Sequence, residues 1–413
     1  MLLLCLCAAA EEPVLRNLPI AWFEAPDHHA PHWRVDFEHP GLTYSERIAL
    51  DVKATISVNE TENRTDWHII LRIADGAGNW FESYGYYRLD LRPSQPGPVP
   101  VSWQGRVFVQ PGTYRLALLA YNAENQQHFV WHKSVNVKRP GELPDLDRNL
   151  PRVEFVHRDR NESPIPEYLP VRTQAPLRID LIFNVTPSLQ LDETRDYNRQ
   201  KTGGKYVASV RPSVEETIRG AAVVLTQLAP SRGCVRVSAV DILRLRVPTD
   251  RSSAAPISTI KQVNRAIESR RDAAVINVAT LAGRTKAREF FHQFINEVVS
   301  DNTGCGPELP FANRIIVVVS DSLVFPQGDD SEPVLPAGQE PVRFFHIRFS
   351  ATYWTVDNGV RASISAQAHS TFDEVGRLLK PFQPRTFDVA QPQDLRHAVA
   401  QIVKDISFTK VLR

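Results

Sequence analysis

Between about residues 32 and 138, hydrophobic positions occur in short runs separated by turn residues. Asp75-Gly-Ala-Gly lies between two apolar runs, and Pro111-Gly-Thr-Tyr leads into a run in which apolar and other positions alternate. Period-two alternation with Gly and Pro turns is typical of half-buried strands in a β-sandwich. The expected strands include 48–58, 66–74, 84–91, 99–107, 113–122 and 130–137.

From about residue 176 the pattern changes to apolar strands that alternate with segments of helical period. Strand 177–183 is followed by a helix over 213–228, where Ser213 and Glu216 form a capping box. Alternating strands and helices predict a parallel sheet covered on both faces. The other expected strands are 235–240, a strand-like 243–247, a short apolar run at 274–278, 314–319, 342–349 and 385–389. The other expected helices are 258–269, 285–300, 371–379 and 393–406.

These patterns predict a multidomain chain. An all-β, immunoglobulin-like sandwich over 13–138 is followed by a linker over 139–173, where Pro and charged residues interrupt the periodic segments. Residues 174–413 then form an α/β doubly wound, Rossmann-like domain.

The first twelve residues are apolar and then small, before a polar segment begins. Met1-Leu-Leu-Leu-Cys-Leu-Cys-Ala-Ala-Ala-Glu-Glu-Pro resembles the end of a secretory signal peptide that lacks its positively charged start. We therefore expect 1–12 to be a signal-peptide remnant with a true start upstream, and the protein to be exported to a periplasmic, cell-envelope or extracellular location. The alternative is a frayed apolar terminus. No later stretch reaches the roughly 18 apolar residues of a membrane-spanning helix.

Composition and motifs argue against two classes of function. A hydrophobic fraction of 42% and a charged fraction of 23% are those of a folded protein, and the net charge of +1 comes without the basic stripe that nucleic acid requires. The sequence has no Gly-x-Ser-x-Gly, no His-Glu-x-x-His and no dinucleotide fingerprint. We therefore expect neither a nucleic-acid partner nor an enzyme.

Two cysteines, Cys234 and Cys305, lie in the expected α/β domain. Both precede expected strands, so both are placed at the same edge of the sheet. In an exported chain this arrangement favours a disulfide between them. The alternative is two separate, small buried hydrophobic side chains.

Candidate ligand residues follow the ends of the expected strands. Asn184, Thr186 and Ser188 follow strand 177–183 at alternate positions, and Asp321 follows strand 314–319. Because the carboxyl ends of parallel strands share one edge, these oxygen-bearing side chains are expected to converge. Thr280, in the loop after the apolar run 274–278, is a further candidate, with Thr285 as its rival.

This frame resembles the metal-ion-dependent adhesion site of a von Willebrand factor type A domain, whose first loop reads Asp-x-Ser-x-Ser. The resemblance matches Thr186 and Ser188 to the two serines and Asn184 to the leading aspartate. It also matches Thr280 to the family's threonine and Asp321 to its second aspartate. In the family these residues hold a divalent cation that a partner's acidic side chain completes.

The sequence departs from the family's loop at Asn184, where an amide replaces the carboxylate of the leading aspartate. Mg²⁺ and Mn²⁺ prefer oxygen ligands that include carboxylates, so binding of either ion is expected to be weakened or lost. The alternative is that Asn184, Thr186 and Ser188 only cap their loop through bonds to the backbone.

The resemblance extends to two-part bacterial exported proteins related to von Willebrand factor, and the first domain is similar in architecture to immunoglobulin and fibronectin modules, which share the Pro-Gly-x-Tyr turn. The resemblance to type A domains implies a non-enzymatic adhesion-type protein that binds a protein partner through the top face of that domain. The alternatives are a metal-independent structural or assembly scaffold of the cell envelope and, as the least favoured, an enzyme.

Overall fold

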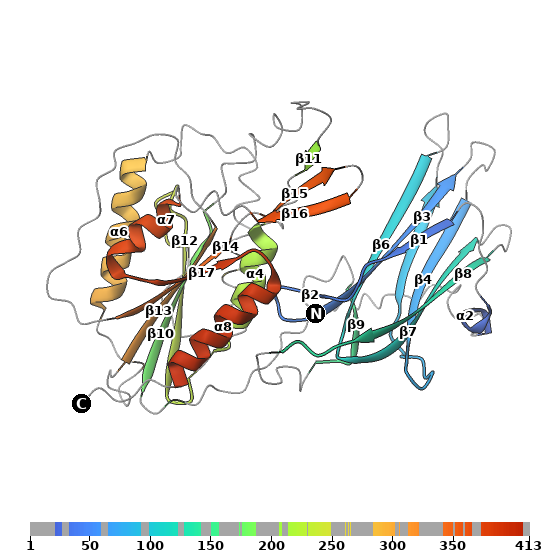
Figure 1. The fold of residues 1–413 in the computed structure, drawn as a ribbon, viewed down its shortest axis with the longest axis horizontal. Helices are drawn as coiled ribbons and strands as arrows, with labels where there is room; N and C mark the ends of the chain where they lie inside the picture. Colours follow the sequence, from blue (N-terminus) through green and yellow to red (C-terminus); the bar gives the residue numbers. More distant parts are fainter. Residues whose placement is uncertain are drawn as a thin grey trace, which may run out of the picture. The chain divides into compact units, whose positions relative to one another are not determined.

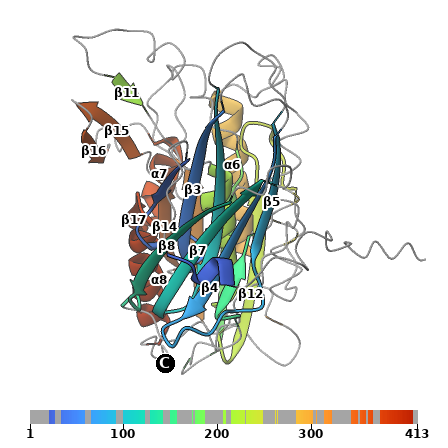
Figure 2. The same ribbon diagram turned by 90° about the vertical axis from the view of Figure 1, so that its right-hand side faces the viewer.

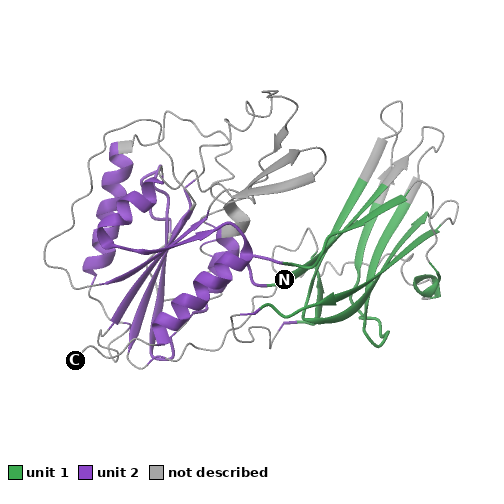
Figure 3. Cartoon of the chain, viewed as in Figure 1, with its two compact units in different colours: residues 1–41, 47–140, 151–164 green, residues 42–46, 141–150, 165–413 purple. Residues whose placement is uncertain are grey.

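The computed structural model forms two compact units (Figure 3). Unit 1 comprises residues 1–41, 47–140 and 151–164, and unit 2 comprises 42–46, 141–150 and 165–413. The expected linker, 139–173, is therefore divided between the units, and residues 42–46 are grouped with unit 2. The residues that the structure describes are 21–26, 33–58, 65–91, 99–122, 128–141, 150–156, 173, 176–186, 206–208, 214–228, 230–248, 261, 263, 265, 284–301, 305, 313–321, 342–349, 352–357, 360–365 and 373–407.

Unit 1 contains two antiparallel sheets that pack face to face (Figure 1). The first has the order β5-β4-β7-β8, and the second has the order β1-β3-β6-β9 with β2 paired to β3. Trp33 of the second sheet lies 5.2 Å from Trp67 and 5.8 Å from Phe129 of the first, between ring centroids. The strands are β1 (Trp33–Phe37), β2 (Gly41–Leu42), β3 (Ile48–Val58), β4 (Thr65–Asp75), β5 (Gly85–Leu91), β6 (Val99–Val109), β7 (Gly112–Asn122), β8 (His128–Val137) and β9 (Val153–Phe155).

The turns that the sequence predicts in unit 1 are present. Asp75 Oδ1 accepts hydrogen bonds from the backbone N–H groups of Ala77 and Asn79, both at 2.9 Å, which closes the turn after β4. The buried Tyr114 at the start of β7 donates its hydroxyl to the carbonyl of Gln110 at 2.8 Å. A short helix, α2 (Ala21–Glu24), buries Phe23 among side chains of β4, β7 and β8.

Unit 2 is built on a five-stranded parallel sheet in the order β12-β10-β13-β14-β17. Numbered along the chain this order is 2-1-3-4-5, one of the common doubly wound arrangements. Helices α4 and α8 cover one face, and α6 and α7 cover the other (Figure 1). The elements are β10 (Leu177–Asn184), α4 (Val214–Leu225), β12 (Gly233–Val240), α6 (Arg284–Ser300), β13 (Asn313–Asp321), β14 (Arg343–Phe349), α7 (Glu374–Leu379), η4 (Lys380–Phe382), β17 (Arg385–Val389) and α8 (Pro392–Ser407).

The interior strand β10 is buried at all eight positions. Its alternate side chains Leu177, Ile179, Leu181 and Phe183 enter the core beneath α4 and α8, while Ile182 enters the core beneath α6. A strand with neighbours on both sides and helices on both faces needs this continuous burial. The sheet therefore fixes the position of the residues where β10 ends.

Two features of unit 2 differ from the expectations. The strand-like segment 243–247 is instead part of a tight turn, closed by an isolated bridge between Asp241 and Arg246. A small antiparallel sheet of β11 (Tyr206–Ala208), β15 (Thr352–Asp357) and β16 (Val360–Ser365) was not expected from the sequence (Figure 2). Of the expected helix 258–269, only Lys261, Val263 and Arg265 are described, all helical, and the run 274–278 lies outside the described residues.

Residues 42–46 are bound within unit 2 although they lie far from it in the sequence. The Tyr44 ring packs edge-on against Phe349 with centroids 5.8 Å apart, and its hydroxyl donates to the Ala390 carbonyl at 2.9 Å. Burial, aided by Asp394, raises the pKa of Tyr44 to about 12. A Cβ on Gly220 of α4 would lie 2.5 Å from the Tyr44 Cβ, so only glycine allows this approach.

Candidate functional site

The candidate site lies at the carboxyl edge of the parallel sheet, where β10 and β13 end next to each other. Phe183 of β10 pairs with Val319 of β13, so Asn184 and Ser320 follow on neighbouring strands. Asp321 ends β13 and pairs with Phe349, the last residue of β14. Pairing thus brings the backbone positions of two predicted site residues, Asn184 and Asp321, to one edge.

Asn184 and Thr186 are buried and hydrogen-bonded to each other. The Asn184 side-chain oxygen accepts a bond from the Thr186 backbone N–H at 3.1 Å and another from the Thr186 hydroxyl. The Thr186 hydroxyl oxygen accepts in turn from the backbone N–H of Ile242 at 2.9 Å. This is the loop-capping pattern of an Asx turn, extended to the neighbouring β12 connection.

The other predicted ligands are described by the structure only in part. The structure gives the backbone of Asp321 but not its side-chain surroundings, and Ser188 and Thr280 lie outside the described residues. The rival Thr285 lies exposed in the first turn of α6. Among the described residues, no group of three or more His, Cys, Asp or Glu side chains has a metal-binding arrangement. Metal binding by the predicted set remains a prediction.

Asp241, which the sequence reasoning missed, also lies at this edge, directly after β12. It is fully buried and accepts from the Arg244 backbone N–H at 3.2 Å. Its carboxylate pairs with the guanidinium groups of Arg244 at 3.1 Å and Arg246 at 3.6 Å. The signal was available, because an acidic residue directly after the strand 235–240 satisfies the same strand-end rule as Asp321.

Ser320 and His346 form a second feature that the sequence did not reveal. Both are fully buried, and the Ser320 hydroxyl lies 2.8 Å from Nε2 of His346. Burial, with a smaller contribution from Arg348, lowers the pKa of His346 to about 3. General bases work best with a pKa near the operating pH. A hydroxyl and imidazole with these properties make a structural hydrogen bond rather than a nucleophile and its base.

Burial of His346 in its neutral form is expected to make the folded state less stable in acid. Between the ordinary pKa of 6.5 and the folded value of about 3, the unfolded chain binds a proton at His346 that the folded chain does not. The free energy of unfolding should therefore fall as the pH decreases through this window, by up to about 1.4 kcal/mol per pH unit from this group. Urea unfolding at several pH values should show a shallower decline for His346→Asn. Parallel curves for the variant and the wild type would contradict this assignment.

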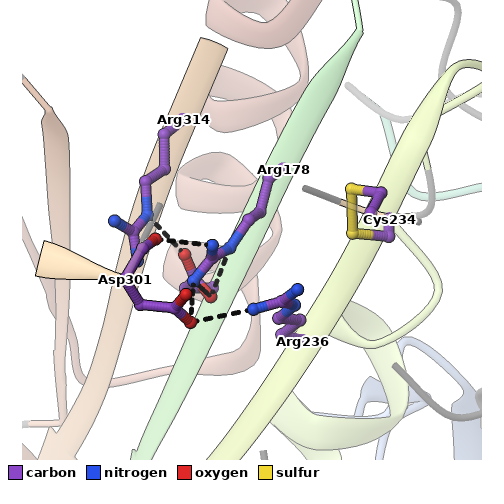
Figure 4. The surroundings of a disulfide bond; sticks show 7 residues. Arg178, Cys234, Arg236, Asp301 and Arg314 are labelled. Carbon is purple, nitrogen blue, oxygen red and sulfur yellow. Dashed lines mark hydrogen bonds and ion pairs between the residues drawn. A yellow bond between two sulfur atoms is a disulfide. The ribbon is translucent and has the colours of Figure 1, made fainter. Parts of the chain in front are cut away.

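At the opposite, amino edge of the sheet lies a buried network of charges (Figure 4). Asp180 of β10 accepts from Arg178 Nε at 3.1 Å and from Arg314 Nε at 2.7 Å. Asp301, just after α6, lies 3.0 Å from Arg178 and 2.9 Å from Arg236. Arg314 also donates to the carbonyls of the last turn of α6, at residues 298 and 299. Desolvation lowers the pKa of Arg314, and Asp180 opposes that shift.

The structure joins Cys234 of β12 and Cys305 by a disulfide, with the two Cα atoms 5.5 Å apart (Figure 4). This is the pairing that the sequence favours over two separate thiols. Cys305 follows Asp301 by four residues and Cys234 is paired with Arg178 across β12 and β10. The covalent bond therefore holds the end of α6 beside the charge network.

Comparison with known proteins gives little information on this chain. No protein-family model matches the sequence, and no curated protein matches it. Among solved structures, Bacteroides uniformis beta-glucuronidase is similar over 26% of this chain and 13% of its own, at 8% identity and a TM-score of 0.19. A calcium-binding mutant of Bacteroides uniformis beta-glucuronidase 2 is similar over 70% of this chain and 34% of its own, at 9% identity and a TM-score of 0.20. Scores this low support no statement on fold or activity.

Within the described part of the chain, no helix is long and apolar enough to cross a membrane.

Proposed function

We propose that the protein is an exported, non-enzymatic binding protein whose unit 2 is a type A-like domain that docks a protein partner through the carboxyl edge of its sheet. The observation that carries this proposal is the Asn184–Thr186 loop at the end of the buried strand β10, beside the end of β13 at Asp321. In open α/β sheets, ligands bind beyond the carboxyl ends of the strands.

The geometry favours weak or absent metal binding in this proposal. The Asn184 oxygen is neutral and already accepts two hydrogen bonds from Thr186, and the Thr186 hydroxyl is bonded to Ile242. A Mg²⁺ or Mn²⁺ ion would compete with these bonds and would gain no carboxylate at position 184. Asn184, Thr186, Ser188, Thr280 and Asp321 are the residues that would hold the ion.

Two further observations support parts of the proposal. The disulfide between Cys234 and Cys305 is typical of proteins in oxidising compartments, which supports export. The low pKa of His346 and the burial of Ser320 argue against a hydrolase built on that pair. The hydrogen-bonded Asn184–Thr186 loop also suits the second candidate, an envelope scaffold that assembles without metal.

Metal-dependent melting separates these functions. Asn184→Asp restores the carboxylate and should give a melting temperature that rises with Mg²⁺ or Mn²⁺. At one hundred times the dissociation constant, ligand linkage stabilises the folded state by about 2.7 kcal/mol. The wild type should show a smaller shift, and Asn184→Asp combined with Asp321→Ala should show none.

The control is Asp388→Ala, which removes an exposed aspartate near the end of β17 and should leave the metal response of Asn184→Asp unchanged. If Asn184→Asp shows no shift at millimolar metal, the site is not a vestigial adhesion site and the scaffold function is favoured.

A further inference from the structure

The turn after β12 presents two apolar side chains to solvent at the edge of the candidate site. Leu245 is 38% exposed and Val247 is 37% exposed, and they are two of the few large hydrophobic side chains exposed among the described residues. They alternate with Arg244 and Arg246, whose guanidinium groups share the carboxylate of Asp241. The turn therefore combines apolar contact area with positive charge.

This turn is rigidly attached to the sheet. Ile242 and Leu243 are buried in the core beneath α6, and Asp241 and Arg246 exchange both backbone hydrogen bonds, at 2.9 and 3.2 Å. The bond from the Ile242 N–H to the Thr186 hydroxyl connects the turn directly to the Asn184 loop. A partner that contacts the Asn184 loop would therefore find Leu245 and Val247 in fixed positions.

Leu245 has a φ of 51°, in the left-handed region that favours glycine and asparagine. Glycine would adopt this conformation without strain, whereas the leucine side chain keeps 38% of its surface exposed. The strain of this conformation therefore offsets part of what the covered surface of Leu245 contributes to stability. Strained residues of this kind concentrate at binding and catalytic sites.

We infer that the turn of residues 241–247 is a docking knob that inserts Leu245 and Val247 into an apolar recess bordered by carboxylates on a partner protein. Charge complementarity supports this occupant, because Arg244 and Arg246 retain exposed side-chain surface of 18% and 42% while the aspartate of the turn, Asp241, is fully buried. The centres of protein interfaces are apolar and enriched in arginine, and polar groups surround them at the rim. The inference rests on the proposed function and names the chemistry of its partner.

Selection of a displayed random-peptide library on the full chain tests this inference. Peptides enriched on the wild type should contain apolar residues next to Asp or Glu, and Leu245→Asn should weaken their binding by about tenfold or more. The same variant should melt at the wild-type temperature or about 2 °C above it, because asparagine relieves the strain. Val156→Asn, which changes a similarly exposed valine in unit 1, is the matched control and should not affect binding.

Enriched peptides that bind Leu245→Asn as well as the wild type would overturn the docking knob. If the binding of such peptides is instead lost in Asp321→Ala, the carboxyl edge still docks a partner and the proposed function survives. If no peptide is enriched on the wild type over Leu245→Asn, or if the enriched peptides lack acidic residues, the partner chemistry proposed here is wrong.

Discussion

Asp180→Ala is expected to lower the free energy of unfolding of unit 2 by about 3–5 kcal/mol. Asp180 is buried between Arg178 and Arg314, and it is the only acidic partner within the described network that bridges both. Its loss leaves Arg314 with carbonyl acceptors and the smaller attraction of Asp301, so a buried positive charge loses its ion-pair partner. Urea unfolding followed by the helical circular-dichroism signal measures this change, because α4, α6 and α8 all belong to unit 2.

The control for this prediction is Asp405→Ala. Asp405 pairs with Arg385 at 3.0 Å, but both side chains are partly exposed, Arg385 at 49% and Asp405 at 33%. Exposed pairs of this kind contribute about 0–1 kcal/mol. Equal effects of the two substitutions would show that the amino-edge network is not buried as described.

Replacing Cys234 and Cys305 together by alanine is the second large change. The disulfide closes a loop with a sequence separation of 71 residues. Loop-closure entropy predicts a loss of about 4 kcal/mol when such a cross-link is removed. The loss should be increased by the weaker positioning of Asp301 beside Arg178 and Arg236.

This prediction is measured by urea unfolding with and without a reductant. The wild type in reductant should unfold at the midpoint of the double variant, and the double variant itself should not respond to reductant. A wild-type midpoint that is independent of reductant would show that the disulfide does not stabilise unit 2.

The parallel sheet was predictable because its strands have a simple pattern. Strand 177–183 reads as an apolar run that Arg178 and Asp180 interrupt, and the observed β10 extends it by one residue to Asn184. The sequence did not reveal why two charges lie inside a buried strand. Their partners, Arg314 and Asp301, are more than 100 residues away along the chain, so no local pattern connects them.

The candidate site was predictable only where strand ends carry the signal. Asn184 and Thr186 do come together, because the residues follow one strand at alternate positions. His346 reads in the sequence as one of three polar residues in β14, and only the pairing of β13 with β14 brings it near Ser320. Strand patterns alone do not determine whether unit 2 is a type A domain or binds a metal, because both properties depend on loops and charges.

The error over residues 243–247 has a physical cause. Leu-Arg-Leu-Arg-Val alternates as a strand does, but a strand needs a neighbour that accepts its backbone bonds. Here Asp241 replaces the neighbouring strand as acceptor, because its carboxylate binds the Arg244 N–H and the guanidinium groups of Arg244 and Arg246. The side-chain bonds of one buried aspartate thus replace a strand with a turn.

The position of residues 42–46 has a consequence for synthesis of the chain on the ribosome. Tyr44 precedes its acceptor, Ala390, by 346 residues, and Glu46 precedes its ion-pair partner, Arg396, by 350. At about 5–20 residues per second, the ribosome needs roughly 20–70 s to add the intervening chain. Unit 2 therefore cannot finish folding during translation, because residues 42–46 make these contacts only after α8 has been synthesised.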